Sequence, residues 1–377
     1  MDLRFSAEDE AFRMKARAWL EAHVPKTALP SGDTREGFAK HLEWERALFD
    51  ARWAVVAWPR EYGGRAASLM QWLIFEEEYW RAGAPQRVTQ NGVFLLAPTI
   101  FSFGTQAQKD RLLKPIAAAE CLWAQGWSEP EAGSDLASLR SYAVRVDGGF
   151  RLYGQKTWTT RGAFCEKIFG PFRTDPKAPA HAGLTYFLVP LHAEGVSVRG
   201  CARLDGDEGF ADVFLDGVFV PDDDVLGGVG NGWKVAMSTT SSERALSLRA
   251  PGRFMATAER LRALCAESPR GADPVLRDRV VRAILDAEAY RFHTFAIATR
   301  MQAGVDLGPE ASLSKLFWSE MDVSMHETAL ALLDEASALQ NAWSKQYQFA
   351  LAGPIYAGTN EIQKNVVAER VLGLPRK

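Results

Sequence analysis

Two short segments of this chain place aromatic and hydroxyl side chains at spacings that suit ligand binding. In WSEPEAGSD (127–135), turn-forming residues surround the hydroxyl groups of Ser128 and Ser134, and in GQKTWTTRG (154–162), Trp158 stands beside two threonines. Backbone N–H groups in such a turn, together with the hydroxyls, can hold a phosphate or a carbonyl oxygen. The same residue types also form plain Pro/Gly turns and half-buried strands. Neither segment alone therefore decides between a binding site and ordinary structure.

A third segment, IYAGTNEIQ (355–363), is typical of an active-site loop but offers no reactive side chain at Ala357. Chemistry that removes a proton needs an acceptor side chain, so the base would have to lie elsewhere in the chain. The sequence has none of the common signatures GxGxxG, GxxxxGK[ST], GxSxG and HExxH. None of the six histidines has a second His or Cys at metal-ligand spacing, so we expect no metal site.

Composition describes an ordinary soluble protein with more than one domain. The 377 residues are 47% hydrophobic and 24% charged, with a net charge of −3, so a large core needs no stabilising cross-links. The chain has no basic stripe, polybasic tail or membrane-length apolar run, and we expect neither nucleic acid nor a membrane span. The four cysteines form no CxxC pair and no secretory signal is present. We therefore expect buried free thiols and a cytoplasmic protein.

Helix and strand signals divide the chain into three zones, which we take as domains 1–120, 121–228 and 229–377. The first zone opens with Ser6 as a helix N-cap before an apolar stripe of helical spacing. The second contains short β-branched and aromatic runs and a hairpin signal at Asp147–Gly149, and the third returns to helical periodicity. This order lacks βαβ alternation, so it argues against a doubly wound nucleotide fold. It favours an α+β multidomain protein with a small β-barrel or sandwich.

Taken in order, these segments resemble the acyl-CoA dehydrogenase family over nearly the whole chain. The EPxAGSD motif at 129–135 and the GTxEIQ…LGLPR motif at 358–376 are specific, and their combination leaves little room for chance. The other matching segments are WPREYGG (58–64), GTQAQKDRLLKPIAAAE (104–120), GQKTWTT (154–160) and VGNGWKVAM (229–237). The resemblance implies an N-terminal helical domain, a middle β-domain and a C-terminal four-helix bundle, which frame FAD at a subunit interface.

The resemblance also implies a reaction, a substrate class and an assembly. Members of this family remove a proton from the α-carbon of an acyl thioester and pass a hydride from the β-carbon to flavin N5. The expected substrate is an acyl-CoA or acyl-carrier-protein thioester, and the expected electron acceptor is electron-transfer flavoprotein or a similar protein. The expected assembly is a homodimer, a tetramer or an α2β2 heterotetramer. Flavin oxidases and monooxygenases of the same superfamily keep the fold with a different reaction.

Several residues match positions that contact the cofactor in the family. Trp158 matches the residue that packs on the isoalloxazine ring, and Thr160 matches the residue that hydrogen-bonds N5. Trp127 and Ser128 match residues on the pyrimidine side, and Ser134 matches a serine near the pyrophosphate and the thioester arm of the substrate. The remaining cofactor-binding residues that the match implies are Gln125, Thr159, Gly358, Thr359 and Glu361.

The base for the α-proton is the main departure from the family pattern. Many members carry it as a Glu in the C-terminal loop, where this chain has Ala357, although the backbone N–H that binds the thioester carbonyl remains. One branch carries the Glu on a helix directly before an Arg, which Glu243 and Arg244 match. We predict Glu243 as the base and Arg244 as a substrate-binding neighbour; the plain alternative for Glu243 is a helical surface charge. Two alternatives remain. Glu361 could serve as the base instead of Glu243, or the chain has no base and completes the active site of a partner subunit.

A second departure concerns segments whose residues reach the FAD of the neighbouring subunit in many members. The RxxFG…Q segment is replaced by CAESPRGADPVLRDRVVRA, and the QxxGGxG segment by about LLDEASALQ. We predict Arg277 as the cofactor-binding cation in their place, with Arg279 as an alternative and a solvated helix charge as the plain interpretation. The departure favours, as an alternative function, a non-catalytic or half-site subunit of a heteromeric acyl-CoA dehydrogenase.

Overall fold

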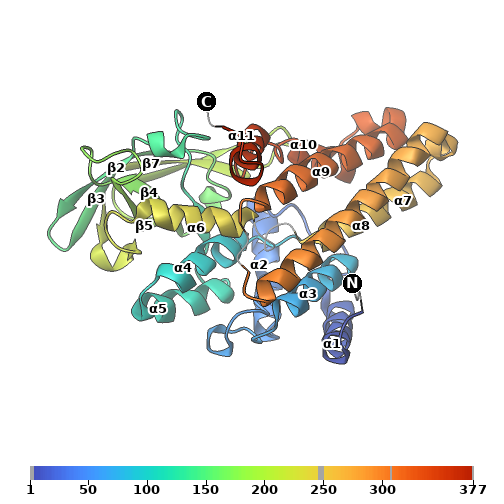
Figure 1. Cartoon of the computed structure of the whole chain (residues 1–377), viewed down its shortest axis with the longest axis horizontal. Coiled ribbons are helices and arrows are strands. Elements are labelled where there is room, and N and C mark those ends of the chain that lie inside the picture. The colour runs from blue at the N-terminus through green and yellow to red at the C-terminus, as the bar shows by residue number, and fades with distance from the viewer. Residues whose placement is uncertain (1–3, 245–249, 306–307, 376–377) are drawn as a thin grey trace. The chain divides into compact units, whose positions relative to one another are not determined.

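The computed structural model describes residues 4–244, 250–305 and 308–375, with 241–244 described by their backbone alone (Figure 1). The chain forms two compact units. One contains residues 27–66 and 85–243, and the other contains residues 1–26, 67–84 and 244–377. Helices precede the strands and follow them, so the predicted α+β order of helical, β and helical zones is confirmed.

The first unit is built around a twisted, mostly antiparallel sheet. Its strand order is β6-β7-β3-β2-β4-β5-β8, and β1 pairs in parallel with β4. The hairpin predicted at Asp147–Gly149 joins β2 to β3, with Gly148 in the left-handed region that a tight turn requires (φ 71°). The strands are β1 (Trp123–Gln125), β2 (Tyr142–Val146), β3 (Gly149–Lys156), β4 (Lys167–Arg173), β5 (Leu184–Pro190), β6 (Val196–Cys201), β7 (Phe210–Pro221) and β8 (Val225–Leu226).

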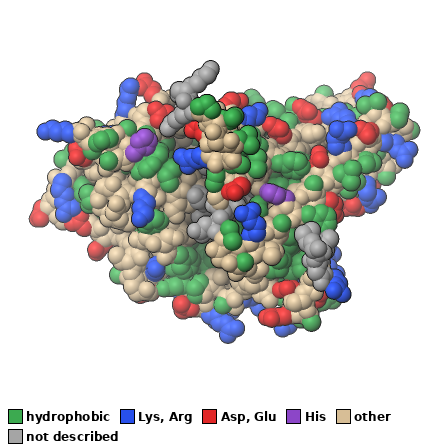
Figure 2. Space-filling view, in the orientation of Figure 1, with side chains coloured by type: hydrophobic (Ala, Val, Ile, Leu, Met, Phe, Trp, Pro, Cys, Tyr) green, Lys and Arg blue, Asp and Glu red, His purple; other side chains and the backbone are tan. Residues whose placement is uncertain are grey.

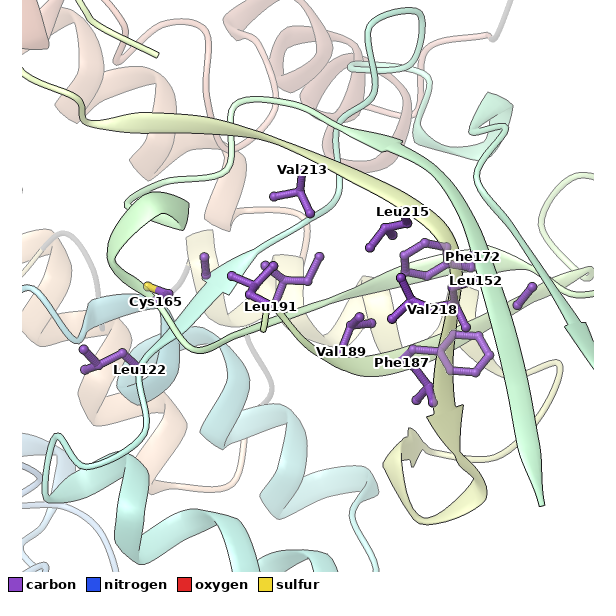
Figure 3. Close-up of a cluster of buried hydrophobic side chains, with 14 of the residues drawn as sticks. Leu122, Leu152, Cys165, Phe172, Phe187, Val189, Leu191, Val213, Leu215 and Val218 are labelled. Atoms are coloured by element: carbon purple, nitrogen blue, oxygen red, sulfur yellow. The ribbon is translucent and has the colours of Figure 1, made fainter. Parts of the chain in front are cut away.

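The core of this unit lies between the strands and the segments that cover them. Aromatic rings of β4 and β5 fill its centre, where Phe172 and Phe187 meet edge to face at 5.8 Å (Figure 3). Five consecutive residues of β4 and six of β5 are buried, so these strands are covered on both faces, whereas β7 alternates between buried and partly exposed side chains. The helices of this unit are α2 (Arg35–Asp50), a π-helical turn (Asn91–Leu96), α4 (Ala97–Phe103), α5 (Gln106–Ala117) and α6 (Gly232–Arg244).

The second unit is helical, and its core forms where α7, α8 and α9 pack on one another. Phe254 of α7 lies edge to face with Tyr290 of α8 at 5.4 Å and stacks with Trp318 of α9 at 6.3 Å. The predicted N-cap of the first helix is confirmed, because the Ser6 hydroxyl accepts the Asp9 N–H at 3.1 Å. The helices of this unit are α1 (Ala7–His23), α3 (Leu69–Arg81), α7 (Pro251–Glu267), α8 (Pro274–Gln302), α9 (Ala311–Leu333), α10 (Ala342–Ala350) and α11 (Asn360–Val366).

The surface matches the charge balance of the sequence. Lys/Arg and Asp/Glu side chains are interspersed over the face in Figure 2. None of the described helices is both long and apolar enough to cross a membrane. The four cysteines are free thiols, as predicted, but only Cys165 is buried. Burial raises the pKa of this thiol far above its usual value, whereas the other three cysteines are half-buried, contrary to our expectation.

A buried carboxylate joins α1 to α3. The side chain of Glu78 is 2% exposed and accepts hydrogen bonds from Arg17 at 2.8 Å, from Arg81 at 2.8 Å and from Arg13 at 3.3 Å. Burial alone would raise the pKa of Glu78, but the hydrogen bonds and charges of the three arginines lower it to about 2. The ion pairs therefore hold two helices that are far apart in sequence.

We expect Glu78→Gln to lower the free energy of unfolding at pH 7 by about 2 kcal/mol, a value discounted for solvent around the arginines. The folded-state pKa is below the ordinary value of 4.5, so this stabilisation is present above that pH and is lost as the pH falls towards 2. Urea unfolding at pH 7 and at pH 3 measures the difference. Glu36→Gln, which removes an exposed pair with Lys40, is the control. Equal midpoints for Glu78→Gln and the native protein at pH 7 would refute the role of this carboxylate.

Candidate active site

The segment 157–161 leaves β3 in an unusual backbone conformation. Trp158 and Arg161 both have left-handed φ angles, 55° and 54°, which non-glycine residues adopt at a cost of about 1 kcal/mol or more. Hydrogen bonds hold the segment against β7, because Thr159 exchanges two backbone bonds with Ala211 at 3.0 Å each. The Thr157 hydroxyl adds a bond to Asp212 at 2.6 Å. The surrounding structure thus imposes a strained shape on this segment.

The shape leaves Trp158 exposed, Thr159 buried and Thr160 half-buried. The Trp158 side chain is 65% exposed, and its only described ring partner is Phe210, edge to face at 5.7 Å. A large exposed aromatic ring on strained backbone favours a binding surface over a packing role. Thr159 is fully buried, and its hydroxyl has no hydrogen-bond partner among the described residues. The Thr160 carbonyl accepts a long bond, 3.4 Å, from the Asn91 side chain on the π-helical turn.

The WSEP turn lies directly against this segment. The Ser128 carbonyl accepts the Thr157 N–H at 2.8 Å, so the two motifs are hydrogen-bonded to each other. Trp127 is nearly buried, and its Nε1 donates to the Tyr186 hydroxyl at 3.0 Å. That hydroxyl lies 3.5 Å from Thr239 of α6. We call residues 157–161 the strap. The turn is therefore hydrogen-bonded to the strap and, through Tyr186, to helix α6, which ends in Glu243 and Arg244.

Two further predicted residues lie on the edges of the same turn. Gln125 is half-buried at the end of β1, in register with Phe169 of β4. Ser134 is exposed, just past the bridge between Glu129 and Ala132. The structure thus brings the predicted β-domain residues into one unit, with Trp158 and Ser134 reaching solvent and Trp127 and Thr159 facing inwards.

A buried ion pair supports both motifs from behind. Lys156 is fully buried, and its Nζ lies 2.8 Å from the Glu129 carboxylate and 3.0 Å from the Pro171 carbonyl. Glu129 also accepts the backbone N–H groups of Arg140 at 2.6 Å and Ser141 at 3.0 Å. Burial lowers the pKa of Lys156, opposed by Glu129. Burial raises the pKa of Glu129, but the charge and hydrogen bond of Lys156 outweigh that and keep it below its usual value.

The C-terminal loop carries a second pair of left-handed residues. Ala357 has φ 57° and Gly358 has φ 80°, and both carbonyls accept bonds of 3.2 Å from the buried Gln363 side chain. Thr359 caps α11 through the N–H of Ile362 at 3.3 Å. Gln363 therefore holds the loop, and Ala357 presents a half-buried methyl group in place of a reactive side chain.

Asn360 and Glu361 follow this cap and have different surroundings. The Asn360 side chain accepts from the fully buried Lys315 at 2.7 Å and from Ser319 at 3.2 Å. Glu361 is exposed in the first turn of α11. Hydrogen bonds to its own backbone N–H and to Thr359 lower its pKa. It is therefore a solvated carboxylate in the structure.

The remaining predicted residues lie on helices α6 and α8. Glu243 and Arg244 end α6, and their side chains lie outside the described residues, so Glu243 stays a prediction. Arg277 is exposed in the first turn of α8, after the N-cap Asp273, and its binding role likewise stays a prediction. The described residues contain no cluster of three His, Cys, Asp or Glu side chains that could hold a metal ion.

Sequence reasoning missed the residues that hold the predicted ones in place. Glu129 lies in the WSEPEAGSD motif and Lys156 in the GQKTWTT motif. The spacing of these motifs does not indicate that the two charged side chains are buried as a pair. Arg161 lies inside the GQKTWTTRG segment and Asn91 lies outside the two motifs, and the sequence assigns neither of them a role. A charged residue inside a run of strand formers, as at Lys156, is the one signal that points to a buried partner.

The comparisons with known proteins agree over the whole chain. Family models described as "Acyl-CoA dehydrogenase, N-terminal domain", "middle domain" and "C-terminal domain" match residues 6–120, 124–218 and 230–372. Acyl-CoA dehydrogenase IpdE1 of Mycobacterium tuberculosis is 36% identical over 382 residues, 98% of this chain and 98% of the relative. The solved Tcur3481-Tcur3483 steroid ACAD is 28% identical with a TM-score of 0.89, over 100% of both chains. The ChsE4-ChsE5 complex from Mycobacterium tuberculosis is 26% identical with a TM-score of 0.85, over 100% of both chains.

We expect Lys156→Met to lower the free energy of unfolding by about 3 to 5 kcal/mol, because it leaves the Glu129 charge buried without its cation. Urea unfolding followed by circular dichroism measures the loss. The matched control is Lys177→Met, which removes an exposed lysine from the same unit and should change little. A Lys156→Met protein as stable as the control variant would show that the buried pair is dispensable.

Proposed function

Because this chain belongs to the acyl-CoA dehydrogenase family, an oxidoreductase family, we propose that it is an FAD-dependent enzyme that introduces an α,β double bond into an acyl thioester. The observation that carries the proposal is the exposed Trp158 ring on a strained strap, hydrogen-bonded to the WSEP turn. The hydroxyl of Thr159, the next residue in sequence, makes no hydrogen bond to the described residues, and a bound polar group would satisfy it. The residues present therefore fit a flat cofactor with polar edges.

The proposed roles follow from what each group can do. When bound, FAD supplies the hydride acceptor for the β-carbon. Trp158 would provide a flat face for the ring system, and the residues that would hold its edge are Thr159, Thr160, Trp127, Ser128 and Gln125. Gly358, Thr359 and Glu361 lie in the loop proposed to contact its phosphate arm, and Arg277 is the proposed cation for that arm. We propose the domain division 1–120, 121–228 and 229–377 for this assembly.

Removal of the proton from the α-carbon needs a hydrogen-bond donor to the thioester carbonyl and a carboxylate that accepts the proton. The Ala357 N–H is the proposed donor to the thioester oxygen, which raises the acidity of the α-carbon. Glu243 is the proposed base, with Arg244 and Ser134 binding substrate beside it. Moving the base onto α6 leaves only a methyl group at Ala357, and a small loop residue makes room for a bulky acyl group. A relative named as a steroid ACAD supports ring-containing acyl thioesters as the first substrates to test.

We expect the purified protein to show the visible absorption of bound flavin and to lose it anaerobically with one member of an acyl-CoA panel. Glu243→Gln should keep the flavin but slow this bleaching by about 10²- to 10⁴-fold, because it removes the proton acceptor. Glu259→Gln, which changes an exposed glutamate that has no proposed role in the site, is the control and should bleach at the native rate. Glu361→Gln as the slow variant would move the base to the loop, and a colourless native protein would refute the proposal.

A second candidate function is a half-site subunit of a heteromer. The observation that favours it concerns the two segments that replace the family's FAD-contacting segments. These two segments are hydrogen-bonded to each other. The Ser268 hydroxyl donates to the Leu332 carbonyl at 2.6 Å, and Arg270 donates to the Ala331 carbonyl at 3.2 Å. Arg270 also pairs with Asp334 at 3.5 Å. An arginine already paired with a carboxylate is a poor site for a pyrophosphate.

The two candidates differ in flavin stoichiometry. The half-site candidate predicts that co-expression with a homologous chain encoded nearby yields a stable complex holding one FAD per heterodimer, measured by absorbance and native mass spectrometry. The reason is that each complete site then uses the adenosine-side segments of the other chain. A homo-oligomer with one FAD per chain and native bleaching activity would contradict the half-site alternative. The chain expressed alone is the control.

A further inference from the structure

A cluster of buried charges lies immediately behind the Trp158 strap. Arg161 follows Thr160 directly, and its guanidinium is 6% exposed. Its Nε lies 2.7 Å from one carboxylate oxygen of Asp33, and Nη1 of Arg203 lies 2.7 Å from the other. Asp33 therefore bridges two arginines from different loops of the sheet unit, and we call these three residues the latch.

The latch joins three segments that are far apart in sequence. Asp33 belongs to the loop before α2, Arg161 to the end of the strap, and Arg203 to the connection between β6 and β7. Arg203 is also tied to Asp205 by two hydrogen bonds of 2.9 and 3.2 Å. Added to Gly209, a β-carbon would lie 2.3 Å from Nη1 of Arg203, so the guanidinium packs tightly on its own loop.

Arg161 depends on Asp33 more than Arg203 does. Among the ion pairs of the described residues, Asp33 is the carboxylate that faces Arg161, whereas Arg203 also pairs with Asp205 and Asp207. Nε and Nη1 of Arg161 are buried and make no hydrogen bond to the described residues, so the 2.7 Å contact with Asp33 is an ion pair without hydrogen-bond geometry. Removing Asp33 would leave a buried guanidinium without a counter-ion, which is costly in a protein interior.

The same residue fixes the end of the strap. The Arg161 N–H donates to the Gly209 carbonyl at 3.0 Å, and its φ of 54° turns the chain away from β3 just after Thr160. If the guanidinium moves towards solvent, this left-handed turn loses the side chain that holds it. Relief of backbone strain would then alter the conformation of Thr160 and Trp158.

We propose that Asp33 is a positioning residue, which acts through Arg161 to hold the Trp158–Thr160 strap in the shape that receives the flavin ring. The proposal rests on the proposed function for its ligand, but the mechanical coupling from Asp33 to the strap does not. Asp33, in the loop before α2 and 128 positions before Arg161, would thus contribute to the flavin site without touching the flavin.

Hydrogen–deuterium exchange tests the coupling without reference to activity. We expect Asp33→Asn to speed amide exchange in residues 157–162 at least tenfold, with a smaller change elsewhere in the sheet, because local opening becomes easier. The matched control is Asp222→Asn, which breaks the exposed pair with Arg145 in the same unit and should leave the strap unchanged. Asp33→Glu keeps the charge and should restore slow exchange in part.

Flavin readouts test whether the strap shape matters for the cofactor. We expect the Kd of FAD to rise about tenfold in Asp33→Asn, with a midpoint potential shifted to more positive values, because an uncompensated guanidinium favours the more negatively charged reduced flavin. The double variant Asp33→Asn/Arg161→Met should lose that shift in potential. A purely structural role would weaken binding in both variants without this difference.

The outcomes test separately whether Asp33 holds the strap and whether the shape of the strap matters for the flavin. Exchange at 157–162 that is unchanged in Asp33→Asn, or raised equally across the whole sheet, would overturn the latch. Faster local exchange with an unaltered Kd and potential would overturn its role towards the flavin. A native protein that binds no FAD would refute the proposed function, while the exchange comparison would still decide whether Asp33 holds the strap.

Discussion

The buried pair of Lys156 and Glu129 is the interaction on which the rest of the site depends. It neutralises two charges that would otherwise prevent β3 and the WSEP turn from packing inside the sheet unit. The Glu129 carboxylate also accepts hydrogen bonds from the backbone N–H groups of Arg140 and Ser141. Lys156 donates a hydrogen bond to the Pro171 carbonyl of β4. One ion pair thus satisfies backbone groups from two segments and leaves the adjacent strap free to adopt a strained shape.

The strain in that strap is tolerated because rigid neighbours surround it. Backbone bonds to β7 hold its middle, the Ser128 carbonyl holds its start and Arg161 anchors its end. Binding surfaces that are organised before the ligand arrives lose less freedom on binding. In the same way, Gln363 holds the two left-handed residues of the C-terminal loop by both of their carbonyls. Both predicted contact regions are therefore shaped by the protein itself.

The sequence was sufficient for the class of fold, the hairpin at Asp147–Gly149 and the N-cap at Ser6, because each depends on local residue chemistry. It also identified the family, which the comparisons confirm. It could not predict that residues 27–66 join the sheet unit while 67–84 join the helical unit, since that choice is made by long-range packing. Nor could it predict that Arg161 meets Asp33, because a charged residue in a loop is normally solvated. The base, Glu243, remains a prediction from the family pattern.

The division of the chain between its two units has a consequence for how the protein folds during synthesis. Helices α1 and α3 precede the strands in the chain, but α3 packs against α7, which begins at Pro251. Until the ribosome has passed that point, α3 can pack against α1 but not yet against α7 or α8. The sheet unit, by contrast, is complete in sequence once Glu243 is made. Nascent chains should therefore reach a stage with a folded sheet and unfinished helices, when aggregation is the main hazard.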